Sequence, residues 1–273
     1  MARVRGGRSG RRRTPALVIQ TIARETPLPE EKDYMKNVEL TQFDSADALV
    51  KAVVQEWFKL LAVRPETAGP YLVALSGGRI AQTFCSEIAS SAQKEPGILS
   101  AVHFFWADER CVPPEHADSN YKIAHDWLFK PMQIPEKQVH RIRGEAEPAV
   151  AAKEAEADLR QTALMVHGDQ PVIDLVFLGV GENGHIASLF PEESEEARQN
   201  RAVYRGVTVT KPPANRVTLG YPALEAARNV WLLASGTGKE QALKDSLAKD
   251  GLTPLARVLK SRPLTRIFSD IKI

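Results

Sequence analysis

Asp174-Leu-Val-Phe-Leu-Gly-Val-Gly-Glu-Asn-Gly-His-Ile-Ala-Ser-Leu-Phe-Pro191 is the stretch that decides the fold of this chain. Its apolar run from Leu175 to Val180 is typical of a strand that is buried on both faces of a parallel sheet. A glycine-rich turn follows and places His185 at the carboxyl end of that strand. Ligands of open α/β sheets bind at this end of the strands, and a histidine there can accept or give a proton near neutral pH. A surface histidine on an ordinary strand-to-helix turn would explain the pattern equally well.

Strand-like and helix-like segments alternate along most of the chain. Short apolar runs predict strands, and amphipathic segments with capping residues predict helices between them. The alternation indicates an α/β fold of one domain, with a mainly parallel open sheet covered by helices on both faces, of the Rossmann-like type. The expected strands are Tyr71–Leu75, Val102–Trp106, Gln138–Ile142, Ile173–Val180, Val203–Thr210, Arg216–Leu219, Asn229–Ala234 and Thr265–Phe268, and the expected helices are Ala46–Ala62, Ile80–Ser90, Glu147–Val166, Pro222–Ala227, Gly238–Ala248 and Pro254–Lys260, with one more starting near Ser119.

Charge is distributed unevenly along the 273 residues. The formal net charge is +2, but residues 1–14 carry six arginines and no acid, so without them 30 basic side chains face 34 acidic ones, a net of −4. The body of the protein therefore lacks the broad basic surface that nucleic-acid binding requires. We expect residues 1–34 to form a disordered basic extension and residues 35–273 to form the folded domain.

Several kinds of site and environment are disfavoured by what the sequence lacks. The two cysteines form no CxxC pair, which suits a reducing compartment. No apolar run approaches the roughly 18 residues that a membrane span needs, and the arginine-rich start lacks a signal-peptide pattern. No histidines, cysteines or carboxylates have metal-ligand spacing. These features predict a cytoplasmic protein without a metal and without membrane contact.

Two further strand ends carry residues that suit an anion. In Leu75-Ser-Gly-Gly-Arg79, glycines would let backbone N–H groups approach a phosphate at a helix N-terminus. A plain tight turn explains this loop as well. In Ser235-Gly-Thr-Gly-Lys239, a lysine in the first helical turn opposes the helix dipole unless an anion lies in front of it. Arg216 follows a Pro-Pro loop and is a further basic candidate. The candidate phosphate-binding residues are therefore Ser76, Gly77, Gly78, Arg79, Arg216 and Lys239.

Charged side chains also follow the strand Val102–Trp106. Asp108 and Arg110 suit a site lined by a carboxylate and a guanidinium, although a surface salt-bridge cluster would have the same spacing. The next segment, His116 to Tyr121, is most simply the capped start of a helix.

Taken together, these segments resemble the 6-phosphogluconolactonase family, within a wider group that includes the glucosamine-6-phosphate deaminases. The resemblance covers about residues 37–270. Two departures stand out: Asn183 replaces an aspartate that the family often has, and Arg79-Ile80-Ala81 replaces Ser-Thr-Pro. The matching segments occur in the family's order and are Leu75-Ser-Gly-Gly78, Trp106-Ala-Asp-Glu-Arg-Cys-Val-Pro113, His116-Ala-Asp-Ser-Asn-Tyr121, Gly179–Pro191, Arg216-Val-Thr218 and Gly236-Thr-Gly-Lys239.

The resemblance implies hydrolysis of 6-phospho-D-glucono-1,5-lactone to 6-phospho-D-gluconate, a step of the oxidative pentose phosphate pathway, with no cofactor. His185 would activate water, Arg110 would stabilise developing charge or hold the phosphate, and N–H groups of the Gly181–Gly184 turn would bind the oxyanion. The implied partner is the sugar-phosphate lactone, bound by a monomer or small homo-oligomer. The implied substrate-binding residues are the six phosphate candidates together with Asp108, Asn183 and Gly184.

Two other functions compete with this hypothesis. A deaminase and isomerase of glucosamine 6-phosphate would need a carboxylate base in place of Asn183, and typically continues the histidine turn with Phe-Asn-Glu-Pro. Here the turn continues Ala187-Ser-Leu-Phe-Pro191, without that glutamate. A sugar-phosphate-sensing domain of a transcription regulator would need a helix-turn-helix, and residues 1–35 are too short and too rich in Gly, Arg and Pro to form one.

Overall fold

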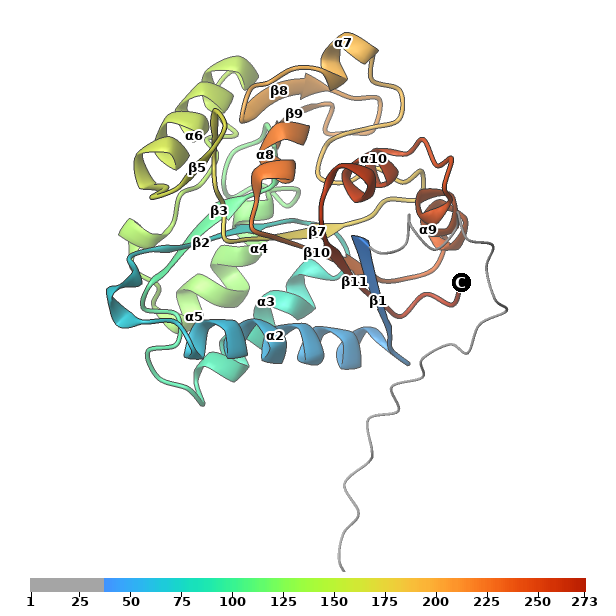
Figure 1. Ribbon diagram of the computed structural model, residues 1–273. Helices are drawn as coiled ribbons and strands as arrows, with labels where there is room; N and C mark the ends of the chain where they lie inside the picture. The colour runs from blue at the N-terminus through green and yellow to red at the C-terminus, as the bar shows by residue number, and fades with distance from the viewer. Residues whose placement is uncertain (1–36) are drawn as a thin grey trace, which may run out of the picture.

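The computed structural model describes residues 37–273 as a sheet flanked by helices (Figure 1). Six strands form the main sheet in the order β1-β11-β10-β7-β2-β3, and all neighbouring pairs are parallel. The α/β class, the single domain and the parallel sheet are thus confirmed. The expected extension at residues 1–34 lies outside the described residues. The six strands are β1 Val38–Gln42, β2 Tyr71–Leu75, β3 Val102–Trp106, β7 Leu175–Gly179, β10 Asn229–Ala234 and β11 Thr265–Ser269.

Strand β7, the apolar run of the quoted stretch, lies between β10 and β2. Four of its five residues are buried, because neighbouring strands and helices cover both of its faces. Parallel strands bring their carboxyl ends to one edge of a sheet, so the loops that follow β2, β7 and β10 meet there. This strand order determines where the candidate site lies.

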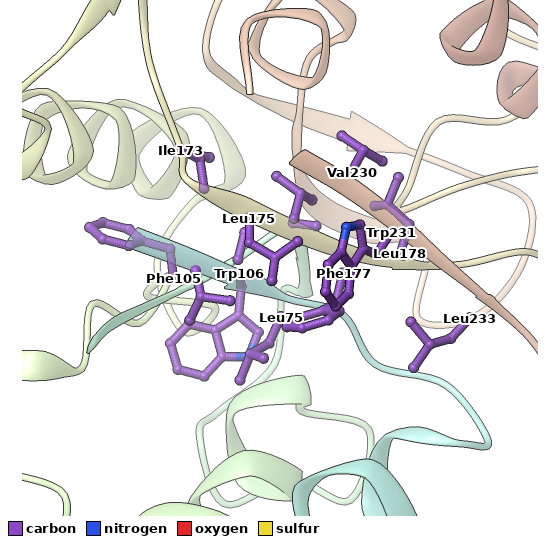
Figure 2. Packing of buried hydrophobic residues seen from close by; sticks show 14 of the residues in the cluster. Leu75, Phe105, Trp106, Ile173, Leu175, Phe177, Leu178, Val230, Trp231 and Leu233 are labelled. Atoms are coloured by element: carbon purple, nitrogen blue, oxygen red, sulfur yellow. The ribbon is translucent and has the colours of Figure 1, made fainter. Parts of the chain in front are cut away.

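Helices cover both faces of the main sheet (Figure 1). On one face lie α2 (Ala46–Ala62), capped by Ser45, and α3 (Ala81–Ala92). Their rings pack on Phe177 of β7, with centroids 5.4 Å from Trp57 and 4.7 Å from Phe84. Figure 2 shows Phe177 beside Trp231 of β10, with centroids 5.9 Å apart. The helices α8 (Tyr221–Ala226) and α10 (Pro254–Ser261) lie on the opposite face, and α9 (Glu240–Leu247) packs against α10.

A small antiparallel sheet, not expected from the sequence as a separate sheet, stands beside the main one. It has the order β4-β9-β8, formed by Asp108–Arg110, Asn215–Leu219 and Tyr204–Thr208, and α6 (Pro148–Thr162) packs on it. The chain leaves β3 and enters β4 within two residues, and the register places Arg110 opposite Arg216. Two candidate arginines from distant parts of the sequence are thereby made neighbours.

The strand expected at Gln138–Ile142 was wrong. Glu136–Gln138 forms a 3-10 turn (η4), and only Val139 makes a single parallel bridge to Phe104. The side-chain amide of Gln138 donates to the carbonyls of Leu99 and Val102, which anchors the segment without a ladder.

The remaining elements are short. Ser119 caps α4 (Asn120–Ala124) as expected, and the helix continues through a π-helical turn, His125–Phe129 (η3), into α5 (Lys130–Met132). None of the helices described between residues 37 and 273 has the length and apolar character needed to cross a membrane. The other short elements are η2 Glu66–Ala68, β5 Val166–His167, β6 Gln170–Pro171 and α7 Glu195–Arg198.

Candidate active site

Loops from three adjacent parallel strands meet at the carboxyl edge of the sheet. Arg79, after β2, forms an ion pair with Glu182, after β7, with Nη2 and Oε1 2.7 Å apart. The loop after β10 completes the group, since a Cβ placed on Gly238 would lie 3.7 Å from the Glu182 carboxylate. The three strand-to-loop junctions singled out in the sequence therefore lie side by side.

His185 is held tightly within the loop after β7. Its ring stacks on Phe190, with centroids 4.3 Å apart and planes at 12°. The ring also lies against the backbone at Gly181, where a Cβ would come within 1.8 Å of Cε1 of the histidine. Only glycine leaves room for the ring at that position.

Asn183 fixes the tautomer of His185. Its Oδ1 lies 2.6 Å from ring Nδ1 and also accepts the backbone N–H of His185 at 3.3 Å. Because the backbone group can only donate, the atom that it meets must be the amide oxygen. The ring nitrogen Nδ1 therefore carries the proton, which leaves the lone pair of Nε2 available to act as a base.

The surroundings of His185 oppose its protonation. Burial is the largest cause, followed by the charges of Lys211, Arg216, Lys239 and Arg110, and together they lower the pKa of the histidine to about 4. The imidazole is therefore neutral at physiological pH.

Lys211 is a cation of the site that was not among the candidates from the sequence. It lies on the exposed loop between β8 and β9. Of the four charges that lower the pKa of His185, that of Lys211 has the largest effect. The Lys-Pro-Pro sequence has no strand-end pattern of its own, and only the pairing of β8 with β9 brings the loop to the site.

Hydrogen bonds to backbone carbonyls and to Ser188 fix the side chains of Arg216 and Asp108. The Arg216 guanidinium, in a residue only 2% exposed, donates to the carbonyls of Pro213 and Lys211, and its Nη1 lies 3.4 Å from Ser188 Oγ. That serine donates in turn to Asp108 Oδ2 at 2.6 Å. Burial and the neighbouring Arg110 lower the pKa of Arg216, while Asp108 acts in the opposite direction.

Among residues 37–273, the guanidinium of Arg110 has fewer hydrogen-bond partners than that of Arg216. Its Nη1 donates to the carbonyl of Asp118 at 2.8 Å, but its buried Nε has no hydrogen-bond partner among the described residues. The guanidinium therefore keeps donors for a further acceptor.

The glycine loop after β2 is only partly free to bind an anion. Ser76 donates its hydroxyl proton to the carbonyl of Phe177 at 2.8 Å. Gly78 has φ +101° and open space where a side chain would stand.

At the neighbouring loop, Lys239 is the residue just before α9, and its pKa is lowered first by burial and then by the nearby charge of Arg79.

The turn before His185 uses part of its own donor set. Gly181 N–H donates to the carbonyl of His185, and Gly184 N–H donates to that of Gly181. Gly184 also packs closely against the N-cap of α10, since a Cβ there would lie 2.6 Å from Thr253. Those two N–H groups are thus not available to an oxyanion, which leaves the N–H groups of Glu182 and Asn183.

The arrangement combines a neutral imidazole base with four cations, two from strands (Arg110 and Arg216) and two from loops (Lys211 and Lys239). Such a site can bind a small anion and remove a proton from water beside it. Within residues 37–273 no group of histidines, cysteines and carboxylates could hold a metal ion.

Comparison with known proteins gives concordant matches. The sequence model of the family described as glucosamine-6-phosphate isomerases/6-phosphogluconolactonase matches residues 44–267. A probable chloroplastic 6-phosphogluconolactonase 3 of Oryza sativa subsp. indica is 31% identical over 238 residues, which cover 84% of this chain and 72% of the relative. Human 6-phosphogluconolactonase is 37% identical over 191 residues, covering 69% and 73%. The 6-phosphogluconolactonase structure from Trypanosoma brucei superposes with a TM-score of 0.73 at 26% identity, covering 85% and 95%.

Proposed function

Because the chain belongs to the family of glucosamine-6-phosphate isomerases and 6-phosphogluconolactonases, we propose that it hydrolyses 6-phospho-D-glucono-1,5-lactone to 6-phospho-D-gluconate. The observation that carries the proposal is the hydrogen bond from His185 to Asn183, which leaves a neutral base among cations. A lactone is an activated ester, so its hydrolysis needs a base for water, donors for an oxyanion and an anchor for the phosphate, but no covalent intermediate.

In the proposed mechanism, Nε2 of His185 removes a proton from a water molecule as the water oxygen attacks C1 of the lactone. The carbonyl π bond breaks, and the negative charge moves to the former carbonyl oxygen. The Arg110 guanidinium and the N–H groups of Glu182 and Asn183 are the candidates to stabilise that charge. The oxyanion then re-forms the carbonyl as the C1–O5 bond breaks, and the imidazolium returns its proton to the departing ring oxygen. The new carboxylic acid loses its proton to the solvent, which gives the gluconate.

We assign the phosphate to Lys239, Lys211 and Arg79, which belong to the loops at the edge of the site. Arg216 contributes mainly through its charge, because its guanidinium donates to carbonyls of its own loop. A bound phosphate offsets the cations around His185, so the pKa of the histidine should rise when the substrate binds. Substrate binding would thus prepare the base for its task.

The deaminase alternative is not favoured. The histidine turn lacks the glutamate that this branch carries, and Asn183 offers an amide where the branch needs a carboxylate. The similar proteins described above are named as lactonases. The cytoplasmic location stays a prediction, since plant relatives are named as chloroplastic. The monomer or small homo-oligomer also stays a prediction.

The proposal is tested by proton release at constant pH on freshly generated 6-phosphogluconolactone, compared with the spontaneous reaction without protein. We expect a rate that is proportional to protein concentration and is lost in the His185→Ala variant. Ammonia release from glucosamine 6-phosphate, without acceleration of lactone hydrolysis, would instead support the deaminase.

A further inference from the structure

Glu109 is a buried carboxylate for which the proposed mechanism has no use. It lies in β4 between Asp108 and Arg110 and is only 2% exposed. Its Oε1 accepts the N–H groups of Arg110 at 2.7 Å and Asn120 at 2.8 Å, and its Oε2 accepts the N–H of Tyr121 at 2.7 Å. The hydroxyl of Ser119 donates to Oε2 at 3.2 Å. One carboxylate thus ties β4 to the first turn of α4.

This tie gives the side chain of Asn120 a fixed direction. Asn120 is 3% exposed, and its Nδ2 donates to the carbonyl of Asp108 at 2.9 Å. Its Oδ1 points at the glycine loop after β2, where a Cβ placed on Gly77 would lie 1.8 Å away. Asn120 therefore touches both the strand that carries Arg110 and the loop that carries Gly78 and Arg79.

The two glycines of this loop are required for different reasons. Gly78 has a positive φ and faces open space, so its requirement is conformational. No positive φ accompanies Gly77, so its requirement comes from the contact with Asn120. The buried Oδ1 of Asn120 has no hydrogen-bond partner among the described residues, which costs stability. A contact that fixes a position at a cost in stability is typical of a functional site.

We propose that Glu109 and Asn120 are positioning residues that set the spacing between Arg110 and the glycine loop. Glu109 fixes the start of α4, and Asn120 then stands as a spacer between the carbonyl of Asp108 and Gly77. The inference rests on the proposed function, because the spacing matters only if one substrate contacts both sides. Small displacements of such groups lower turnover strongly, by about 10²-fold for an error near 1 Å.

A double-mutant cycle tests the spacer role. Gly77→Ala adds a methyl group that Asn120 obstructs, so we expect kcat/KM for the phosphorylated lactone to fall by about 10²-fold. Asn120→Ala removes the obstruction and the spacer together, and we expect a loss of about 10-fold. The double variant should then be no worse than Asn120→Ala alone, so that the second change rescues the first. Losses that simply multiply in the double variant would overturn the proposal.

Asn229→Ala is the matched control. Asn229, at the start of β10, also donates its side-chain Nδ2 to a backbone carbonyl, that of Asp174 at 3.0 Å, but at the opposite end of the sheet. Both asparagine variants should lower the melting temperature, whereas only Asn120→Ala should lower kcat/KM at 25 °C, where each variant is verified as folded by circular dichroism. Equal activities of the two folded variants would refute the positioning role.

Glu109→Gln supplies a second variant in case Gly77→Ala does not fold. The amide cannot accept all the N–H groups that the carboxylate accepts, so we expect kcat to fall as the start of α4 shifts. Unchanged kcat in the folded variant would contradict the proposal. Parent activity is measured first: an inactive parent refutes the proposed function, whereas an active parent with multiplicative losses refutes the positioning role alone.

Discussion

Oδ1 of Asn183 accepts the ring N–H of His185 across 2.6 Å, so an uncharged amide orients the candidate base. A carboxylate in that position would stabilise the imidazolium, whereas an amide orients the ring without doing so. Burial lowers the pKa of His185 most, and the charges of Lys211, Arg216, Lys239 and Arg110, which the neutral amide does not offset, lower it further, to about 4. Asn183 thus orients His185 as an aspartate in its place would, but it leaves the imidazole a weaker base.

Replacing His185 by alanine should abolish most of the turnover. General acid–base help contributes about 10²–10⁴-fold, so we expect kcat for the phosphorylated lactone to fall by at least about 10²-fold. The melting temperature should change little, because the ring is held by its own loop. His167→Ala, at an exposed position in β5, is the control and should keep full activity. Near-native turnover of His185→Ala at saturating lactone would exclude the histidine as the base.

The pH dependence of kcat/KM should follow the lowered pKa of His185. The active form is the neutral imidazole, so activity is lost only as the pH falls through the folded pKa, near 4. In Asn183→Asp the carboxylate favours the imidazolium, and the acid limb should move up by at least about one pH unit. Unphosphorylated glucono-1,5-lactone is the substrate to use, since a phosphate monoester titrates itself near pH 6. An acid limb of the parent near 6.5, unmoved by Asn183→Asp, would contradict this assignment.

Removing the Lys239 ammonium should affect substrate affinity more than turnover. The phosphate is remote from the reacting carbonyl, so Lys239→Ala should raise KM well above its effect on kcat. A hydrogen bond to a charged group contributes about 1.5–3 kcal/mol, so the preference for phosphorylated over plain lactone should fall by about 10-fold or more. Lys211→Ala should act in the same direction more weakly. Lys94→Ala, at an exposed position just after α3, is the control and should have no effect. Undiminished discrimination between the two lactones would exclude Lys239 as a phosphate ligand.

Glu182 should compete with the substrate for Arg79. Its carboxylate lies 2.7 Å from Nη2 of that arginine, and both side chains are mostly exposed. Such pairs contribute about 0.2–1 kcal/mol, so Glu182→Gln should lower KM by a factor of about 1.4–5. The gain should disappear in an Arg79→Ala background. An increase of KM in Glu182→Gln would show that the glutamate supports the substrate rather than competes with it.

Five of the six strands of the main sheet could be predicted because they are local patterns, whereas the edge strand β1 was not among the expected strands. The bounds expected for β2, β3 and β10 match the structure, and so do those of α2, since apolar runs and a capping serine mark them directly. Burial of the runs on both faces leaves little choice of conformation.

The small sheet and the residues that it positions could not be predicted in the same way. The register of Arg110 with Arg216 joins positions more than a hundred residues apart, and no local pattern encodes it. The contribution of Lys211 depends on the pairing of β8 with β9. The Glu109–Asn120 contact depends on the way in which the chain passes from β3 into β4. Within residues 37–273, the Gln138–Ile142 segment makes only one parallel bridge, between Val139 and Phe104, and the side-chain amide of Gln138 supplies further hydrogen bonds that no apolar pattern indicates.

The cations around His185 also act beyond contact distance. They stand in a body whose residues outside 1–14 carry a formal charge of −4, so the positive field is concentrated at one end of the sheet. Fields of this kind steer small anions and raise association rates by about 10-fold or more. Salt shortens their reach, from about 10 Å at 0.1 M to about 3 Å at 1 M. At low ionic strength, sugar phosphates should therefore be drawn to the loops from a distance of about 10 Å or more, whereas at 1 M salt the attraction should act only near contact.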